Sequence, residues 1–118
     1  MADVTIYHNP RCSTSRAAME VASEAGVEVD TVHYLKEPLD ESGLRTLLGQ
    51  LEDPATDLVR RDAYFKELGL TDSDVADEDQ IIKVLVEHPK LMQRPVLVKG
   101  GRAIIGRPKD RVPAFLAS

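Results

Sequence analysis

The order of its periodic segments most constrains what this chain can fold into. Residues 4–7 form a short β-branched run, residues 14–25 place apolar side chains on one helical face, and residues 27–34 alternate in hydrophobicity. Parallel strands need a crossover connection, and in proteins that crossover is right-handed. The first third therefore predicts a strand–helix–strand unit with two parallel strands.

The last third predicts an antiparallel hairpin followed by a helix. Residues 96–99 and 102–105 are rich in Val, Ile and Leu, and they flank Gly100 and Gly101. Two glycines can both take the positive φ that a tight hairpin turn requires. After Pro108 the chain turns helical again, with Val112, Phe115 and Leu116 on one face. The hairpin and the parallel pair together predict a mixed sheet.

The middle third predicts helices only. Leu44, Leu47, Leu48 and Leu51 have the spacing of an amphipathic helix. Residues 58–68 predict one or two short helices ending at Gly69, and Asp77 can cap a further helix that stops near Pro89. The complete order is β-α-β, a helical insert at about 40–90, then β-β-α. We therefore expect an α/β protein of thioredoxin-like fold, with a mixed central sheet, as one domain spanning residues 1–118.

Composition narrows the possible functions. A net charge of -5 argues against a nucleic-acid-binding surface, although a few local arginines can still bind a small anion. The sequence shows no transmembrane run, and its N-terminal residues do not have the pattern of a signal peptide. A single cysteine excludes an intramolecular disulfide. We therefore expect a cytoplasmic protein that binds neither nucleic acid nor membrane.

That cysteine, Cys12, lies in a polar loop between the first strand and the first helix. Free N–H groups and the helix dipole favour an anion at a helix N-terminus, so the pKa of this thiol should be lowered. A charged His8, together with Arg11 or Arg16, would act in the same direction, and the hydroxyls of residues 13–15 add donors. The alternative is that Cys12 is only a small buried apolar residue.

Several kinds of thiol chemistry do not match the spacing. Ser15 stands where a Cys-X-X-Cys pair would have its second cysteine, and Ala18 stands where a C-x5-R phosphatase loop needs arginine. His8, His33 and His88 lack the spacing of metal ligands, so we expect no metal site. An adduct on a lone cysteine can be resolved only by an outside thiol, such as glutathione.

Residues 6–16, Ile-Tyr-His-Asn-Pro-Arg-Cys-Ser-Thr-Ser-Arg, resemble the active-site signature of the glutaredoxin-coupled arsenate reductase family. Residues 58–61, 91–96 and 105–108 resemble the segments that form the anion site in that family. The resemblance implies that Cys12 is the nucleophile and that His8 helps to lower its pKa. It further implies a cis peptide before Pro95 and an oxyanion pocket formed by three arginines, which are Arg60, Arg94 and Arg107.

The resemblance implies reduction of arsenate to arsenite, with no bound cofactor, glutathione as co-substrate and glutaredoxin as protein partner. Two other functions remain open. One is a glutathione-linked thiol transferase, which would need Cys12 but not three arginines. The other is a thioredoxin-like regulator that binds RNA polymerase. Such regulators commonly carry a Cys-X-X-Cys switch, which Ser15 interrupts here.

Overall fold

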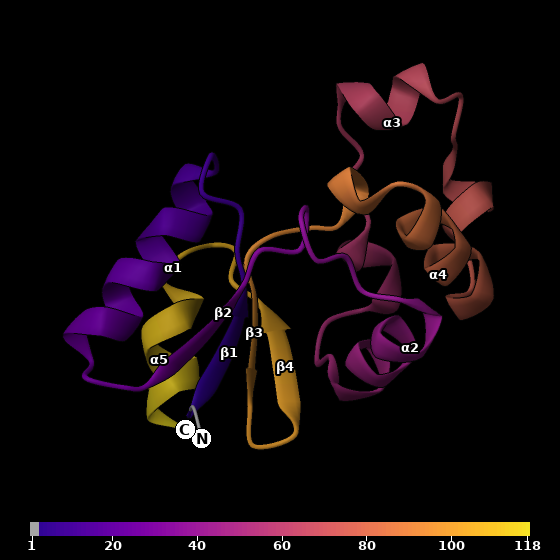
Figure 1. The fold of residues 1–118 in the computed structure, drawn as a ribbon. Helices are drawn as coiled ribbons and strands as arrows, with labels where there is room; N and C mark the ends of the chain where they lie inside the picture. Colours follow the sequence, from indigo (N-terminus) through magenta and orange to yellow (C-terminus); the bar gives the residue numbers. More distant parts are fainter. Residues whose placement is uncertain (1–2) are drawn as a thin grey trace.

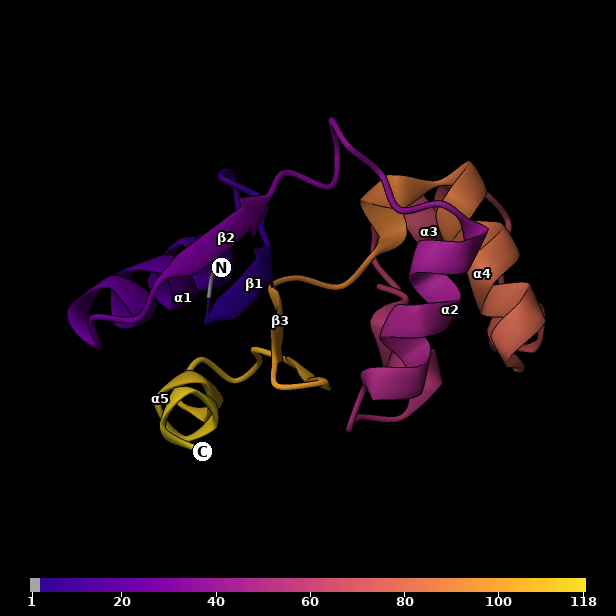
Figure 2. The ribbon, with the colours of Figure 1, turned by 60° about the horizontal axis from the view of Figure 1, so that its bottom comes forward.

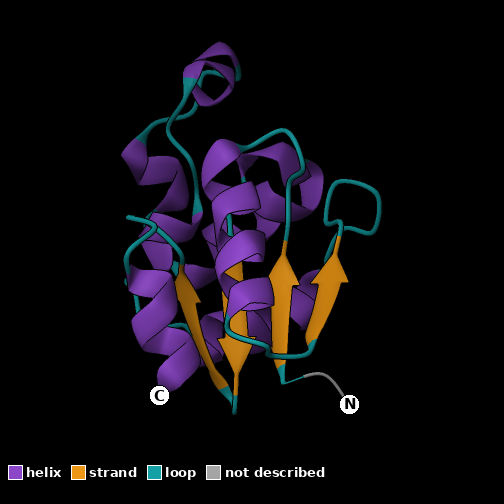
Figure 3. Cartoon of the chain, turned by 90° about the vertical axis from the view of Figure 1, so that its left-hand side faces the viewer, coloured by secondary structure: helices purple, strands orange, loops and turns teal. Residues whose placement is uncertain are grey.

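The computed structural model describes residues 3–118 and contains one four-stranded mixed sheet with the order β2-β1-β3-β4. The central strand β1 (Val4–Tyr7) pairs in parallel with β2 (Val29–Val32) and antiparallel with β3 (Val96–Lys99). The edge strand β4 (Arg102–Ile105) is antiparallel to β3. Helices cover both faces of this sheet (Figure 3). The predicted α/β class, the mixed sheet and the thioredoxin-like order are confirmed.

Alternation along the strands assigns each side chain to one face of the sheet. Ile6, Leu97 and Ile104 lie opposite one another in the register and pack, on one face, against α1 (Ser13–Glu24) and α5 (Arg111–Ala117). These two helices lie side by side in Figure 1. The sequence predicted both helices from their apolar faces.

The opposite face of the sheet packs against the helical segments between β2 and β3. Val96 and Ile105 share the second apolar cluster with Leu44 and Leu47 of α2. Figures 1 and 2 show these helices gathered on the side of the sheet away from α1 and α5. They are α2 (Glu41–Gln50), α3 (Ala63–Glu67) and α4 (Glu78–Glu87), with short 3-10 turns η1 (Ala55–Leu58), η2 (Asp72–Val75) and η3 (Pro89–Leu91).

Local side-chain bonds start two of the inserted helices, and the sequence predicted one of these caps, Asp77. The Asp77 carboxylate accepts from the Gln80 N–H at 2.8 Å, and the Gln80 side chain accepts from the Asp77 N–H at 3.2 Å, which forms a capping box. Asp40 caps α2 by accepting from Gly43 N–H at 2.7 Å. At the hairpin, Gly100 and Gly101 have φ of 58° and 78°, as a primed turn requires.

Two sequence predictions need correction. The second strand covers Val29–Val32 rather than 27–34, because the chain turns after Val32: the His33 carbonyl accepts from the Lys36 N–H at 2.9 Å. Residues 58–68 are not wholly helical. Val59 forms an isolated antiparallel bridge with Met92, and only Ala63–Glu67 are α-helical. Tertiary pairing at this point outweighs the local helical pattern.

Candidate active site

Cys12 is the N-cap residue of α1. Its backbone is extended, with φ -99° and ψ 122°, and its carbonyl accepts the first helical hydrogen bond, from Arg16 N–H at 2.9 Å. The Cys12 N–H donates to the Asn9 carbonyl at 3.0 Å, which closes the preceding turn. The residue is 8% exposed. An N-cap side chain faces the free N–H groups of the first helical turn, so the sulfur occupies the position where an anion is stabilised.

The environment of Cys12 favours the thiolate. Burial raises the pKa of this thiol, but hydrogen bonds from the Ser15 N–H, the Arg94 side chain and the Thr14 N–H lower it. The positive charge of Arg107 lowers it further, and the pKa of Cys12 ends below its ordinary value. The sequence predicted this direction. The charges responsible belong to Arg94 and Arg107, far along the chain, rather than to Arg11 or Arg16.

His8 contacts Ser15 rather than acting as a neighbouring charge. Its Nδ1 is 2.7 Å from Ser15 Oγ, and that same oxygen accepts from the Asn9 N–H at 3.0 Å. Burial and the positive charges of His33 and Arg16 lower the pKa of His8, which favours the neutral imidazole. The role that the resemblance implies for His8 stays a prediction. The structure offers an indirect route, through a fully buried Ser15 whose N–H faces the thiol.

Arg107 makes a direct contact with the thiol. Its Nη2 donates to Cys12 Sγ at 3.2 Å, and its Nε donates to the Arg94 carbonyl at 2.7 Å. The residue before it, Gly106, donates its N–H to the Pro95 carbonyl at 2.8 Å. A Cβ at Gly106 would lie 2.9 Å from side-chain atoms of both Pro95 and Leu97, so only glycine allows this close approach. The bonds from Arg107 and Gly106 to the Arg94 and Pro95 carbonyls thus hold the Arg107 guanidinium beside the Cys12 sulfur.

The bridge between Val59 and Met92 brings the other two arginine segments together. Arg60 N–H donates to the Leu91 carbonyl at 2.7 Å on one side of the bridge. Burial and the positive charge of Arg94 lower the pKa of Arg60, while nearby Asp62, 3.7 Å away, opposes this shift. Arg107 thus contacts the Cys12 sulfur, Arg94 lies close enough to lower the pKa of the thiol, and Arg60 lies beside Arg94.

Two buried polar atoms lie at the base of this cluster without a partner among residues 3–118. They are Arg94 Nε and the Tyr34 hydroxyl. Burial raises the pKa of Tyr34 and the positive charge of Arg94 opposes that rise, so the phenol stays neutral near pH 7. Tyr34 follows a strand and has the character of an ordinary core aromatic, so nothing in its sequence context marks it as a site residue.

Both peptide bonds before the prolines beside the site arginines are cis, namely Arg94–Pro95 and Arg107–Pro108. The resemblance implied the first of these, at the entry to β3. The second was not expected. Each places an arginine directly before a proline at the same end of the sheet.

An ion pair supports the segment that carries Arg107. Asp53 lies 2.9 Å from Arg111 Nη1, and its carboxylate also accepts from the Ile105 N–H at 2.9 Å. Arg111 in turn donates to the Ile105 carbonyl at 2.8 Å. These bonds join the chain after α2 to the end of β4. No local pattern in the sequence marks either residue, since Asp53 and Arg111 lie far apart along the chain.

We expect Asp53→Ala to lower the free energy of unfolding by about 1–3 kcal/mol, because it leaves a half-buried guanidinium and a strand-end N–H without their acceptor. Urea denaturation would measure the change. Glu67→Ala, at an exposed position on α3, is the matched control and should change stability by less than about 0.5 kcal/mol. Equal, small effects of the two substitutions would show that the ion pair does not hold this segment.

Two further observations concern the described residues only. Within 3–118 no group of three or more His, Cys, Asp and Glu side chains is placed to hold a metal ion. Over the same range, every helix is too short or too polar to cross a membrane.

The fold and the site together define a thioredoxin-like protein with one thiol at a helix N-terminus, in contact with the Arg107 guanidinium. Comparison with known proteins gives the particular group: the chain belongs to the ArsC family, whose sequence profile matches residues 7–115. Family membership agrees with the resemblance found in the sequence motifs.

Two curated relatives and one solved structure illustrate the similarity. The chain is 46% identical over 111 residues to Uncharacterized protein YfgD of Escherichia coli K12, covering 92% of each chain. It is 38% identical over 118 residues to an arsenate reductase of Neisseria meningitidis serogroup A, covering 98% of this chain and 100% of the relative. The structure of an arsenate reductase from Vibrio cholerae has a TM-score of 0.84 and 34% identity, covering 94% and 95% of the two chains.

The lowered pKa of Cys12 leads to a direct prediction about its reactivity. Because only the thiolate reacts, the alkylation rate should rise with pH through a midpoint below about 8.5, the free-thiol value, and then level off. Iodoacetamide, a neutral reagent, suits the measurement, and the chain has no second thiol to confuse it. In urea the midpoint should return to about 8.5. A folded-state midpoint at or above that value contradicts the assignment of an activated thiolate.

Proposed function

We propose that this protein is an arsenate reductase that converts arsenate to arsenite through Cys12, with electrons supplied by glutathione and glutaredoxin. The single observation that carries the proposal is the contact of 3.2 Å between Arg107 Nη2 and Cys12 Sγ. A guanidinium beside a nucleophilic sulfur can bind an oxyanion and stabilise the thiolate that attacks it. The relatives named arsenate reductase agree with this function.

In the proposed first step the Cys12 thiolate attacks arsenic(V), and one arsenate oxygen leaves as water after it is protonated. The new bond joins Cys12 Sγ to arsenic. Arg60, Arg94 and Arg107 hold the remaining oxygens and balance their charge in the transition state. Guanidinium groups suit this task because their planar N–H forks match the oxygens of a tetrahedral anion and stay charged at any working pH.

In the later steps outside thiols complete the reduction. Glutathione displaces a second oxygen as water and forms an arsenic–sulfur bond. The glutaredoxin thiolate then attacks the glutathione sulfur, the electron pair of that bond moves to arsenic, and arsenic(V) becomes arsenic(III). The product of this attack is a mixed disulfide of glutathione and glutaredoxin. Water then releases arsenite from Cys12. These steps require no second cysteine in the chain, which has one.

A steady-state assay with arsenate, glutathione and glutaredoxin tests the proposal. We expect arsenite formation that needs both the thiol and the glutaredoxin. Disulfide exchange without arsenite formation would instead favour a glutathione-linked thiol transferase. If neither activity is found but the protein binds RNA polymerase, the regulator is favoured. The proposed reaction belongs to the cytoplasm, where glutathione keeps thiols reduced.

A further inference from the structure

A cleft of about 590 Å³ opens beside the thiol loop and extends well beyond Arg60 and Arg94, the two site arginines that line it. One wall is the loop of residues 8–11 and the turn after β2. The opposite wall is formed by Arg60, Tyr64 and Lys90 of the helical insert. The cleft thus lies between the two sides of the molecule that Figure 1 shows to the left and right. A tetrahedral oxyanion needs only its inner end, so the outer part has room for a larger ligand.

The outer part of the cleft is cationic. Arg11, Lys36 and Lys90 line it in addition to Arg60 and Arg94, whereas Asp62 is the one carboxylate in its wall. This contrasts with the whole chain, whose net charge is -5. Within residues 3–118, no carboxylate lies within ion-pair distance of Lys36 or Lys90. Lys90 lies over the Tyr64 ring, 5.6 Å from its centre.

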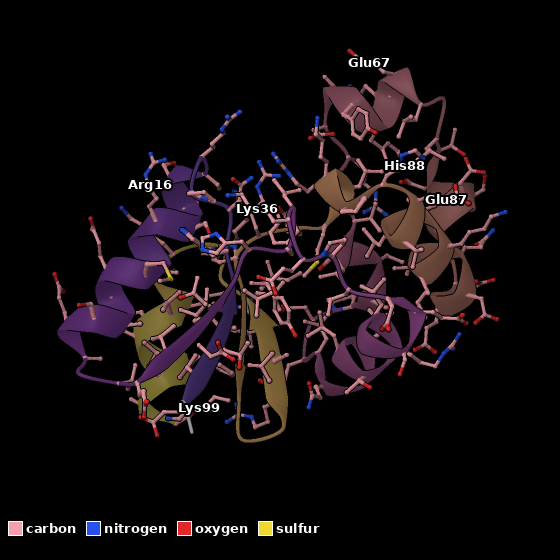
Figure 4. The ribbon with its side chains drawn as sticks, in the orientation of Figure 1. Arg16, Lys36, Glu67, Glu87, His88 and Lys99 are labelled. Atoms are coloured by element: carbon pink, nitrogen blue, oxygen red, sulfur yellow. The ribbon has the colours of Figure 1, made fainter. Side chains whose placement is uncertain are left out.

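The place of Lys36 follows from the turn after β2. The Lys36 N–H and the Glu37 N–H both donate to the His33 carbonyl at 2.9 Å, which closes this turn. The turn lies on the segment that links β2 to α2 (Figure 2). Figure 4 labels Lys36 near the middle of the molecule, between the α1 side and the α3 side. Leu35 beside it is 42% exposed, and it is one of two large apolar residues that are exposed among those described. The cleft therefore offers both cations and an apolar contact.

We propose that this cleft binds the outside thiol itself, an anionic peptide thiol of the glutathione class, with Lys36 and Lys90 holding its carboxylates. Such a thiol carries two carboxylates and one ammonium group, so it complements a wall of several cations and one carboxylate. The inner end of the cleft, at His8 and Asn9, adjoins Cys12, where the bound thiol must react. The inference rests on the proposed function in one respect: both assume that the outside thiol reacts at Cys12.

The test measures thiol attack on Cys12 without arsenate. Cys12 is first converted to a mixed disulfide with 4-thiopyridine. A glutathione thiolate then attacks Cys12 Sγ, the thiopyridine leaves with the bonding electrons as a neutral thione after protonation, and a Cys12–glutathione disulfide forms. Release of the thione gives the rate. Glutathione diethyl ester, whose carboxylates are masked, is the comparison thiol.

We expect glutathione to react faster than its ester with the unaltered protein, and the difference to shrink as salt rises. Lys36→Ala and Lys90→Ala should each slow glutathione by roughly twofold to fivefold and leave the ester unchanged. Lys83→Ala, at an exposed position on α4 outside this cleft, is the matched control and should slow neither thiol.

Two results would overturn the proposal: equal slowing of glutathione and its ester, or no slowing of either in a variant that combines Lys36→Ala with Lys90→Ala. The outcome is separable from the arsenate reaction. Selective slowing of glutathione in a protein that fails to reduce arsenate would retain the cleft and reject the proposed function. Arsenate reduction, together with thiol selectivity that the lysine variants leave unchanged, would retain the proposed function and reject the cleft.

Discussion

Cys12→Ser is expected to lower arsenate reduction by more than roughly a thousandfold, which in practice abolishes turnover. A serine hydroxyl stays protonated near pH 7, and so the nucleophile is lost. The fold should be unaffected because serine is nearly isosteric and is a favourable residue at a helix N-cap. Steady-state arsenite formation with glutathione and glutaredoxin measures the loss.

The control for this variant is its stability. Urea denaturation of Cys12→Ser should give a free energy of unfolding within about 1 kcal/mol of that of the unaltered protein. The chain contains no other thiol that could replace Cys12. Arsenite formation at more than a few per cent of the original rate would therefore reject Cys12 as the nucleophile.

Removing the guanidinium that touches the sulfur should have the second largest effect. Arg107→Ala deletes a charge-assisted hydrogen bond of 3.2 Å to Cys12 and, in the proposed function, a contact to arsenate, worth roughly 1.5–3 kcal/mol. We expect kcat/KM for arsenate to fall about tenfold to a hundredfold, and Arg94→Ala to behave similarly. Arg107→Lys should restore only part of the loss, since it keeps the charge but not the planar fork.

Arg102→Ala is the matched control for the arginine variants. Arg102 pairs with Glu52 at 2.9 Å on the exposed end of the hairpin, at the other end of β4 from Arg107. Arg102→Ala should leave kcat/KM for arsenate within about twofold of that of the unaltered protein, because exposed ion pairs contribute little to stability. In Arg107→Ala, the rate at which iodoacetamide alkylates Cys12 at high pH should change much less than the rate of arsenate reduction. If arsenate reduction is unaffected in Arg107→Ala, the anion pocket is wrong and the thiol transferase becomes the better function.

Arg60 illustrates the limit of sequence reasoning. Arg60 and Arg61 are adjacent arginines, and only the family resemblance selects Arg60. In the structure Arg61 is engaged elsewhere, because its Nε donates to Asp72 at 2.9 Å and its Nη1 to the Val59 carbonyl at 2.7 Å. Arg60 instead lies beside the positive charge of Arg94. The extended backbone at the Val59–Met92 bridge separates the two side chains, and the helical pattern of residues 58–68 did not predict that bridge.

What the sequence determined by itself is local. Periods of two and 3.6 residues predicted the strands and helices, Gly100–Gly101 predicted the hairpin, and Asp77 predicted a helix start, since each depends on neighbours within a few positions. The lowered pKa of Cys12 is also partly a local property that the sequence predicted. The backbone N–H groups of Thr14 and Ser15 that stabilise its thiolate come from the helix that Cys12 itself begins.

Only the tertiary structure decided what surrounds that thiolate. The bridge at Val59, the bond from Arg107 to the Arg94 carbonyl and the Asp53–Arg111 pair each join segments that are distant in sequence. Periodicity cannot predict such pairings, because it reports which face of an element is apolar and not which distant segment packs beside it. A cationic site in an acidic chain therefore became visible only when the sheet and its insert brought those segments together.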